Sequence, residues 1–202
     1  MRFTNLVRQE EGWETKTATT HWTDKHLSVA TELVKTPTNE KPRPWTIVHR
    51  KAAVVIAPVT ADGRFLLIRQ ERVPIRATIW EMPAGQIDDN ADPDDTQIQG
   101  VALRELHEET GHDLAAGGEL ISLGYFFSSP GFTDEHCYFF LARPVVPAAV
   151  HAAEEGEGII DCRDFTAKEL VAMIAENEIR DSNTLSICAR LAARGFLSFH
   201  TS

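Results

Sequence analysis

Three glutamates in the middle of the chain have spacings that bring carboxylates to one face of a helix. Glu105, Glu108 and Glu109 stand at positions i, i+3 and i+4. Like charges so spaced repel by roughly 0.2 to 0.5 kcal/mol per pair, so solvent or a cation must face them. Hard oxygen donors without a cluster of thiolates or imidazoles favour Mg²⁺, or Mn²⁺ in its place. The segment therefore indicates a divalent-metal site, with Arg104 holding Glu105 or Glu108 in its metal-binding rotamer. The alternative is a solvated acidic helix face.

The helix that carries these glutamates is marked at both ends. We expect it over residues 93–110, with Asp92 as its N-terminal cap and a proline at its first position. Gly111, directly after it, is the residue type that most often ends a helix. Leu103 and Leu106 are expected to point away from the carboxylates and toward the core.

Short apolar or alternating runs on both sides of this helix predict strands. They lie at residues 27–34, 52–57, 65–68, 120–125, 136–142 and 159–165. Thr166 and Glu169 form a capping-box pair that is expected to open a second helix, ending near residue 175. With a third helix over about 182–194, the pattern predicts an α/β fold of the α+β type, a helix-sheet-helix sandwich with a mixed β-sheet.

The chain divides into two parts by character. Residues 1–50 are polar and alternate only weakly, so they predict a small antiparallel β appendage that needs a partner surface. The main domain is expected over residues 51–202, because the first apolar run of buried-strand length starts at its beginning. Its last helix is expected to bury one apolar face, formed by Leu185, Cys188, Ala189 and Ala192.

Composition limits the partners. The 202 residues include 43% hydrophobic and 25% charged residues, enough for a full core, and the formal charge is −10 with a pI near 5.2. Such a surface repels long nucleic acid but allows a small anion held by a few arginines and a metal. The three dispersed cysteines suit buried thiols in a reducing compartment. Without a signal-peptide or membrane-spanning run, a cytoplasmic location is expected.

Two segments together resemble the Nudix box. Residues 81–88 read Glu-Met-Pro-Ala-Gly-Gln-Ile-Asp, and residues 104–111 read Arg-Glu-Leu-His-Glu-Glu-Thr-Gly. The family pattern is Gly, five residues, Glu, seven residues, then Arg-Glu-aliphatic-x-Glu-Glu-x-Gly-aliphatic. Here the arginine follows the glycine by nineteen positions, five more than in the pattern. The resemblance implies a Nudix fold.

The first glutamate of that pattern is missing. Its place is taken by Ala91 when counted from the glycine and by Thr96 when counted back from the arginine. Asp92, Asp94 or Asp95 is a candidate substitute, and we expect activity to be weakened rather than abolished. His112 replaces a usually aliphatic residue, which is expected to affect packing more than chemistry.

Further segments resemble the ADP-ribose pyrophosphatase branch of the family. They lie at residues 43–50, 68–72, 128–135, 154–159 and 181–184. The resemblance implies that Trp45 stacks on adenine and that Arg50 contacts phosphate. Its substrate-binding set is Trp45, Arg50, Arg72, Glu81, Pro130 and Gly131. The plainer alternatives are that Trp45 only fills the seam between the appendage and the main domain, that Arg50 and Arg72 form surface ion pairs, and that Pro130 and Gly131 make an ordinary turn.

The same resemblance assigns roles in the chemistry. The metal ligands would be Glu105, Glu108, Glu109 and the Ala84 carbonyl, with Arg104 and Glu108 counted among the catalytic residues. Glu157 or its neighbour Glu155 would accept the proton of the attacking water, unless this glutamate-rich run is a solvated loop.

The implied reaction cleaves a nucleoside diphosphate sugar, ADP-ribose first, into AMP and ribose 5-phosphate. The branch exchanges N-terminal strands between subunits, so a homodimer is expected. Rival interpretations are a hydrolase for another nucleoside diphosphate sugar or dinucleotide, a weakly catalytic nucleotide-sugar sensor, and a calcium-binding structural protein.

Overall fold

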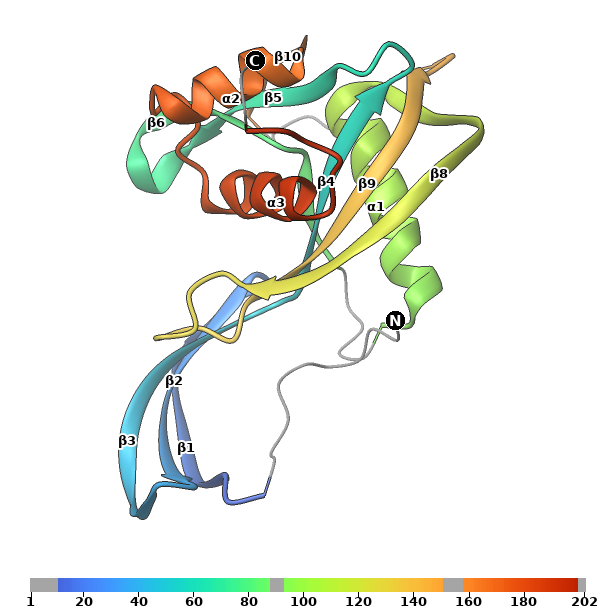
Figure 1. Ribbon diagram of the computed structural model, residues 1–202. Helices are drawn as coiled ribbons and strands as arrows, with labels where there is room; N and C mark the ends of the chain where they lie inside the picture. The colour runs from blue at the N-terminus through green and yellow to red at the C-terminus, as the bar shows by residue number, and fades with distance from the viewer. Residues whose placement is uncertain (1–10, 88–92, 151–157, 200–202) are drawn as a thin grey trace.

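Two β-sheets and three α-helices make up the fold of the computed structural model over its described residues, 11–87, 93–150 and 158–199 (Figure 1). The N-terminal sheet consists of β1 (Glu14–Thr23), β2 (Leu27–Thr36) and β3 (Asn39–Arg50). The main-sheet strands are β4 (Ala53–Thr60), β5 (Phe65–Arg72), β6 (Ala77–Glu81), β7 (Ala84–Gln86), β8 (His112–Phe127), β9 (His136–Pro147) and β10 (Ile159–Phe165). The helices are α1 (Asp95–Thr110), α2 (Ala167–Ala175) and α3 (Ser182–Ala193), and a 3₁₀ turn, η1 (Val73–Ile75), follows β5.

The main sheet is mixed, as predicted. Its order is β10-β5-β4-β9-β8, with β6 paired to β5 and β7 paired to β4. β4 and β9 run parallel, and the other pairs are antiparallel. The register between β4 and β5 consists of one pair, Val59 with Phe65, after which the two strands take different neighbours. The turn from β6 to β7 therefore passes through the place where the sheet opens.

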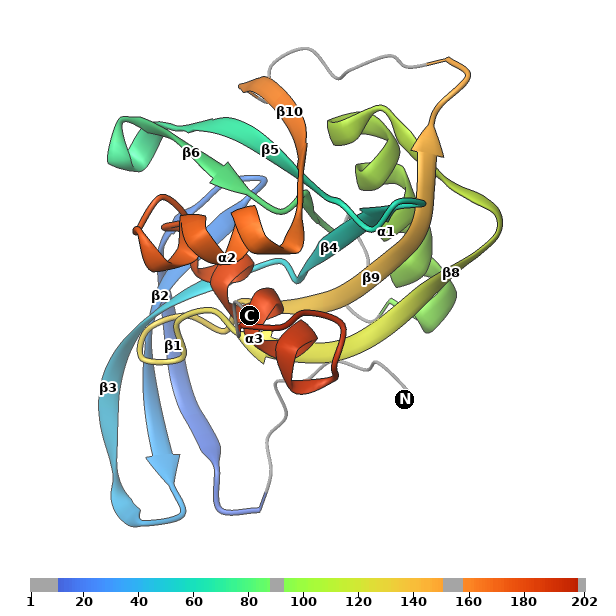
Figure 2. The same cartoon turned by 45° about the horizontal axis from the view of Figure 1, so that its top comes forward.

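Helices cover both faces of this sheet. Ile98, Ala102 and Leu106 of α1 are buried in one apolar core. Leu170 of α2 and Leu191 of α3 belong to a second core. Figures 1 and 2 show α1 on one side of the sheet and α2 and α3 on the other. The predicted helix-sheet-helix arrangement is confirmed.

Helix α1 begins two residues later than predicted. Asp94 is its cap: the Asp94 carboxylate accepts from the Gln97 amide at 2.8 Å, and the Gln97 side chain accepts from the Asp94 amide at 2.9 Å. The placement of Pro93 at the first helical position, after an Asp92 cap, was therefore wrong. Asp94 is favoured as the cap because Gln97, three residues later, completes a capping box with it. Asp92 itself lies outside the described residues.

Two predicted helix faces also need correction. Leu106 is fully buried, but Leu103 is exposed, because it lies about 100° around the helix from the buried Ala102. On α3, Leu185 and Ala189 face outward. Cys188 is buried as predicted and Ala192 packs against the core, but the rest of the buried side is formed by Thr184, Ile187 and Leu191.

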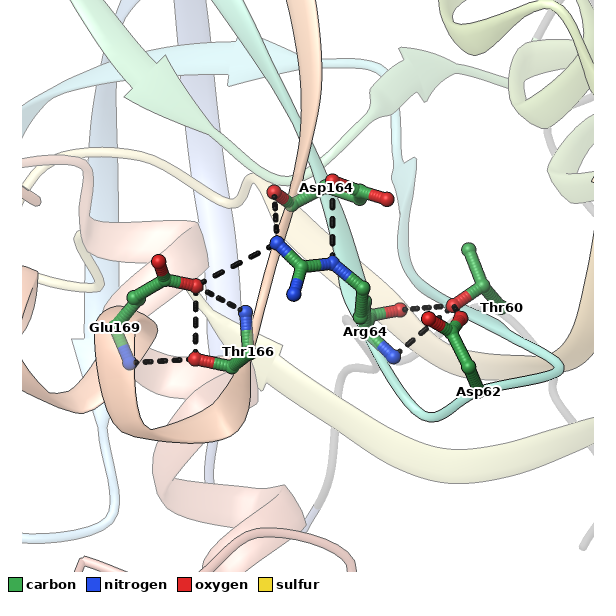
Figure 3. Close-up of polar contacts among 6 residues, drawn as sticks. All are labelled: Thr60, Asp62, Arg64, Asp164, Thr166 and Glu169. Carbon is green, nitrogen blue, oxygen red and sulfur yellow. Dashed lines mark hydrogen bonds and ion pairs between the residues drawn. The ribbon is translucent and has the colours of Figure 1, made fainter.

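Helix α2 begins where predicted, at the capping box. The Thr166 hydroxyl accepts from the Glu169 amide at 3.2 Å, and the Glu169 carboxylate accepts from the Thr166 amide at 2.7 Å. Arg64 points from the β4–β5 hairpin toward this helix start, with ion pairs to Asp164 at 3.2 Å and to Glu169 at 3.6 Å (Figure 3). These contacts fasten β10 and α2 to the hairpin.

The cysteines are free thiols, as expected. Cys137 and Cys188 are buried and Cys162 is half-buried. Burial raises the pKa of Cys137 and Cys188 to about 12, and burial with nearby carboxylates raises that of Cys162 to about 11. Thiols with such pKa values are poor nucleophiles at neutral pH. Within the described part of the chain, no helix is both long and apolar enough to cross a membrane.

Candidate functional site

The turn between β6 and β7 sits directly on the glutamate face of α1. The Ala84 amide donates to the Glu109 carboxylate at 2.7 Å. The carboxyl group of Glu105 occupies the space beside Gly85, where a Cβ would lie only 2.0 Å from its Cδ atom. Glu105 and Glu109 are both buried, although their helix faces solvent elsewhere. The two halves of the motif predicted from the sequence are thus brought together.

Arg104 links two of the three glutamates. Its guanidinium lies 2.9 Å from an oxygen of Glu105 and 3.1 Å from an oxygen of Glu108. The contact that we predicted for Arg104 is present with both partners. A guanidinium between two carboxylates offsets their repulsion and restricts their rotamers.

The chemistry of these donors fits a hard divalent cation. The carboxylates of Glu105, Glu108 and Glu109 lie along one helix face. Because Gly85 has no side chain, the Glu105 carboxylate can occupy the space next to it. Among the residues described, no group of three or more histidine, cysteine, aspartate or glutamate side chains is gathered as a ready metal cluster.

No described residue of α1 takes the place of the missing family glutamate. Asp94 and Asp95 precede Glu105 by eleven and ten positions, which is about 15 to 17 Å along a helix axis. Thr96 is exposed in the same first turn. None of these side chains can share an ion with the glutamates. The other candidates, Ala91 and Asp92, lie outside the described residues.

Arg72 and Glu81 form a pair at the start of the same turn. The Arg72 Nε donates to Glu81 at 2.8 Å, and its NH2 group also binds this carboxylate. The Glu81 side chain is 2% exposed and that of Arg72 is 41% exposed. Burial raises the pKa of Glu81 despite its partner, whereas the hydrogen bond to Glu81 raises the pKa of Arg72. Glu81 therefore anchors Arg72, whose outer side still reaches solvent beside a hollow of about 400 Å³ lined by Arg72 and Arg76.

Arg50 is held by the loop that follows β8. Its Nε lies 3.1 Å from Glu135, and its amide donates to Asp134 at 2.9 Å. The Val48 amide also donates to the Phe132 carbonyl at 2.8 Å. This loop carries the exposed Pro130 and Gly131, so the structure places them beside the end of β3.

His49 lies between carboxylates from two elements, which the sequence did not reveal. Its Nδ1 is 2.6 Å from Asp134 of the loop and its Nε2 is 3.0 Å from Glu32 of β2. Burial lowers the pKa of His49, but the hydrogen bonds and charges of Asp134 and Glu32 outweigh it, so the pKa is raised. A histidine with these partners fastens the N-terminal sheet to the main domain. A lone histidine in a strand gives no sequence signal of such a contact.

Trp45 stands apart from the acidic helix within one chain. Its side chain is 50% exposed, so it does not fill the seam between the N-terminal sheet and the main domain. It lines a hollow of about 360 Å³ with Trp13, Pro37, Lys41 and Arg43 among others, all from the N-terminal sheet and its approaches. The lining includes none of the 81–86 turn or of α1.

The glutamates expected to act as general base, Glu155 and Glu157, lie outside the described residues. The residue that follows them is fixed: the Glu71 amide donates to the Gly158 carbonyl at 2.9 Å. Gly158 has a φ of +69°, and an added Cβ would lie 3.2 Å from that of Glu71. Gly158 therefore lies beside the end of β5, which carries Arg72.

The sequence also missed a buried contact behind the turn. Thr184 of α3 is fully buried, and its hydroxyl accepts from the Met82 amide at 2.8 Å. Asp181, the cap of α3, accepts from the Thr184 amide at 2.7 Å and from its hydroxyl at 2.8 Å. The Asp-x-x-Thr start of α3 shows a cap, but nothing local indicates its partner about a hundred residues away.

Known proteins resemble this chain in sequence and in fold. The model of the NUDIX domain matches residues 48–186. An ADP-ribose pyrophosphatase of Bacillus subtilis (strain 168) is 30% identical over 160 residues, covering 79% of this chain and 82% of that protein. A methanol dehydrogenase activator of Bacillus methanolicus is 32% identical over 139 residues, covering 69% of this chain and 71% of that protein.

The fold comparison agrees. A crystal structure of an ADP compounds hydrolase has a TM-score of 0.73 at 17% identity, and the match covers 95% of this chain and 100% of that chain. The resemblance stated from the motif is confirmed by the family match, and the fold by this superposition. With its two motif halves joined at Gly85 and Ala84, the chain belongs to the NUDIX domain family and is a Nudix hydrolase.

Proposed function

We propose that the protein hydrolyses ADP-ribose to AMP and ribose 5-phosphate with Mg²⁺, for which Mn²⁺ can substitute. The observation that carries the proposal is the seating of the 84–85 turn on the glutamates of α1, through the Ala84–Glu109 hydrogen bond and the Glu105–Gly85 contact. Its support from relatives is that two ADP-ribose pyrophosphatases, of Bacillus subtilis and Mycobacterium tuberculosis, are 30% and 27% identical to this chain.

The residues divide the work as follows in this proposal. Glu105, Glu108, Glu109 and the Ala84 carbonyl hold the metal, and Arg104 orients the carboxylates. Nudix hydrolases generally use a divalent metal, which when bound neutralises diphosphate charge and lowers the pKa of a water.

Glu157 or Glu155 takes the proton of the attacking water. The water oxygen bonds to one phosphorus while the bridging P–O bond breaks, which leaves two phosphomonoesters. Arg72, anchored by Glu81, and Arg50 are proposed to contact the phosphates, with Pro130 and Gly131 beside them. A fixed guanidinium suits this role because it binds two phosphate oxygens at once.

We also propose a homodimer in which the N-terminal appendage, residues 1–50, completes the site of the main domain, residues 51–202, in the partner. The proposal rests on Trp45, whose hollow shares no lining residue with the acidic site of its own chain. A second chain is the simplest means of bringing an adenine-stacking tryptophan to that site. The β1 strand adds support, because nearly all of its residues are exposed in a single chain.

The substrate is proposed to be a small nucleotide in the cytoplasm, because a net charge of −10 disfavours long polyanions. Another nucleoside diphosphate sugar or a dinucleotide remains the rival substrate. The Bacillus methanolicus relative supports this alternative. A protein named as an activator is as similar to this chain as one named as an ADP-ribose pyrophosphatase, so sequence identity alone does not select the substrate. A binding sensor is the second rival, because no described α1 residue replaces the missing glutamate.

The decisive experiment measures phosphate-product release from ADP-ribose, other nucleoside diphosphate sugars and dinucleotides, with Mg²⁺ or Mn²⁺. Glu109→Gln keeps an oxygen for the Ala84 amide but removes the charge, so we expect activity to fall at least a hundredfold. Glu169→Gln, on the opposite face of the sheet, is the matched control. Faster turnover of another diphosphate would show that this compound, and not ADP-ribose, is the preferred substrate. Nucleotide binding without turnover would show that the protein is a sensor.

The dimer is tested by complementation. A mixed dimer of Trp45→Ala and Glu109→Gln chains has one intact site if the site is shared between chains. The same dimer has two impaired sites if each chain builds its own. Recovery of activity on coexpression, with a mass twice 22.5 kDa by light scattering, is expected. A monomer, or a mixed dimer without recovery, would contradict the shared site.

A further inference from the structure

Three consecutive residues, the two between β6 and β7 and the first of β7, are each held through a backbone group by a different element. The Met82 amide donates to Thr184 of α3 at 2.8 Å. The Pro83 carbonyl accepts from the Ile56 amide of β4 at 2.9 Å. The Ala84 amide donates to Glu109 of α1 at 2.7 Å. The turn is thus fastened between helices that lie on opposite faces of the sheet (Figures 1 and 2).

The α3 side of this arrangement is buried and directional. Thr184 is fully buried and Met82 is 1% exposed. The Thr184 hydroxyl donates a hydrogen bond to the Asp181 carboxylate, so the hydroxyl oxygen presents a lone pair to the Met82 amide. A hydroxyl that donates a hydrogen bond to a carboxylate is itself a better acceptor for the amide. The orientation of the hydroxyl is therefore fixed rather than free to rotate.

The connection matters because the pairing of β6 ends at Glu81 and that of β7 starts at Ala84, so Met82 lies between two paired strands rather than within one. β4 and β5 diverge after their single pair, and β7 is only three residues long. Without Thr184, the Met82 amide would be buried with no hydrogen-bond partner in its place, which is costly. Relaxation of Met82 would move Ala84, and with it the amide that orients Glu109.

We propose that Thr184, oriented by Asp181, is a positioning residue for the reaction: it holds the Met82–Ala84 turn against Glu109. This inference rests on the proposed function, but its structural half can be measured without turnover. Thr184 acts through the backbone and touches no substrate.

The test uses Thr184→Val, which removes the hydroxyl at nearly constant volume, and Thr184→Ser, which restores it. Thr166→Val is the control, because it removes the capping hydroxyl of α2, shown in Figure 3, without touching the turn. Two quantities are measured well below the unfolding transition of every variant: kcat and KM for ADP-ribose, and hydrogen exchange of the peptide containing Met82.

Thr184→Val is expected to lower kcat at least tenfold with KM within twofold, and to speed exchange at Met82 at least tenfold. Thr184→Ser should return both values to within threefold of the unchanged protein, and Thr166→Val should alter neither. Unchanged kcat in Thr184→Val, or exchange that stays slow, would overturn the inference. If the unchanged protein cleaves no diphosphate, the proposed function fails instead, and the exchange result alone decides whether Thr184 holds the turn.

Discussion

Replacing Gly85 by alanine tests whether the observed position of Glu105 is the working one. The backbone accepts alanine, because Gly85 does not have a positive φ. The new Cβ would lie 2.0, 2.2 and 2.4 Å from Cδ, Oε1 and Oε2 of Glu105. The first of these distances is about 1.4 Å short of ordinary contact at 3.4 Å, so the carboxylate must withdraw by more than 1 Å.

The structure separates the cost in stability from the cost in activity. The obstructing atoms are the end of a flexible side chain, so we expect unfolding to become easier by only about 1 kcal/mol, the low end for overpacking. A displacement of about 1 Å in a catalytic group costs roughly a hundredfold in rate. This loss corresponds to about 2.7 kcal/mol in the activation free energy.

The assay compares kcat/KM for ADP-ribose with Mg²⁺ against the free energy of unfolding in urea. Gly100→Ala is the matched control. Gly100 lies in α1, the helix that carries Glu105, and a Cβ added there meets nothing within 4 Å. It should stabilise the protein by up to about 1 kcal/mol with unchanged rate. If Gly85→Ala keeps more than a third of the activity, the idea that the Gly85 contact positions Glu105 for catalysis is refuted.

Three other predictions use the same unfolding measurement. Arg72→Met should destabilise the protein by about 2 to 3 kcal/mol, less than for a fully buried pair because Arg72 is partly exposed, and adding Glu81→Gln should recover most of it; no recovery would mean that the buried charge is not the cause. Because the pKa of His49 is raised in the folded state, its stabilisation is complete below its unfolded value of 6.5 and lost as pH rises through the folded pKa. His49→Gln should remove this decline in a series of unfolding midpoints from pH 5.5 to 9, and parallel curves would contradict it. Asp94→Ala should cost about 1 kcal/mol of stability through the lost cap and leave kcat unchanged, whereas a loss of Mg²⁺-dependent activity would show that Asp94 serves the site.

Features with a local chemical signature, such as helix caps, could be predicted from the sequence. This held even at α1, where the wrong aspartate was chosen as the cap. The capping box at Thr166 and Glu169 fixes the start of α2 because its two partners are only three positions apart. At α1, three nearby aspartates compete, and the cap is decided by Gln97, whose amide and side chain both engage Asp94. The motif halves were joined correctly because the family pattern already encodes their proximity.

Features that depend on distant packing could not be predicted. Leu106 was placed correctly, but nothing near Leu103 shows that the buried stripe runs through Ala102 rather than through Leu103. The pairing of His49 with Asp134 joins residues 85 positions apart. Such contacts are set by how the two sheets and the loop meet, and no pattern of period 2 or 3.6 contains that information.

The fastening of the Met82–Ala84 turn by α3 has a consequence for biosynthesis. Met82 and Thr184 are 102 positions apart. During synthesis, both halves of the motif, residues 81–88 and 104–111, are therefore made well before Thr184, the residue that holds the turn in place. Contacts of such long range are slow to form, because a large loop must close first. The glutamates of α1 can therefore be synthesised and helical while the turn above them is still loose. Catalytic competence should appear late, when the last helix docks, and a ribosome-stalled chain ending before α3 should show the helix without the activity.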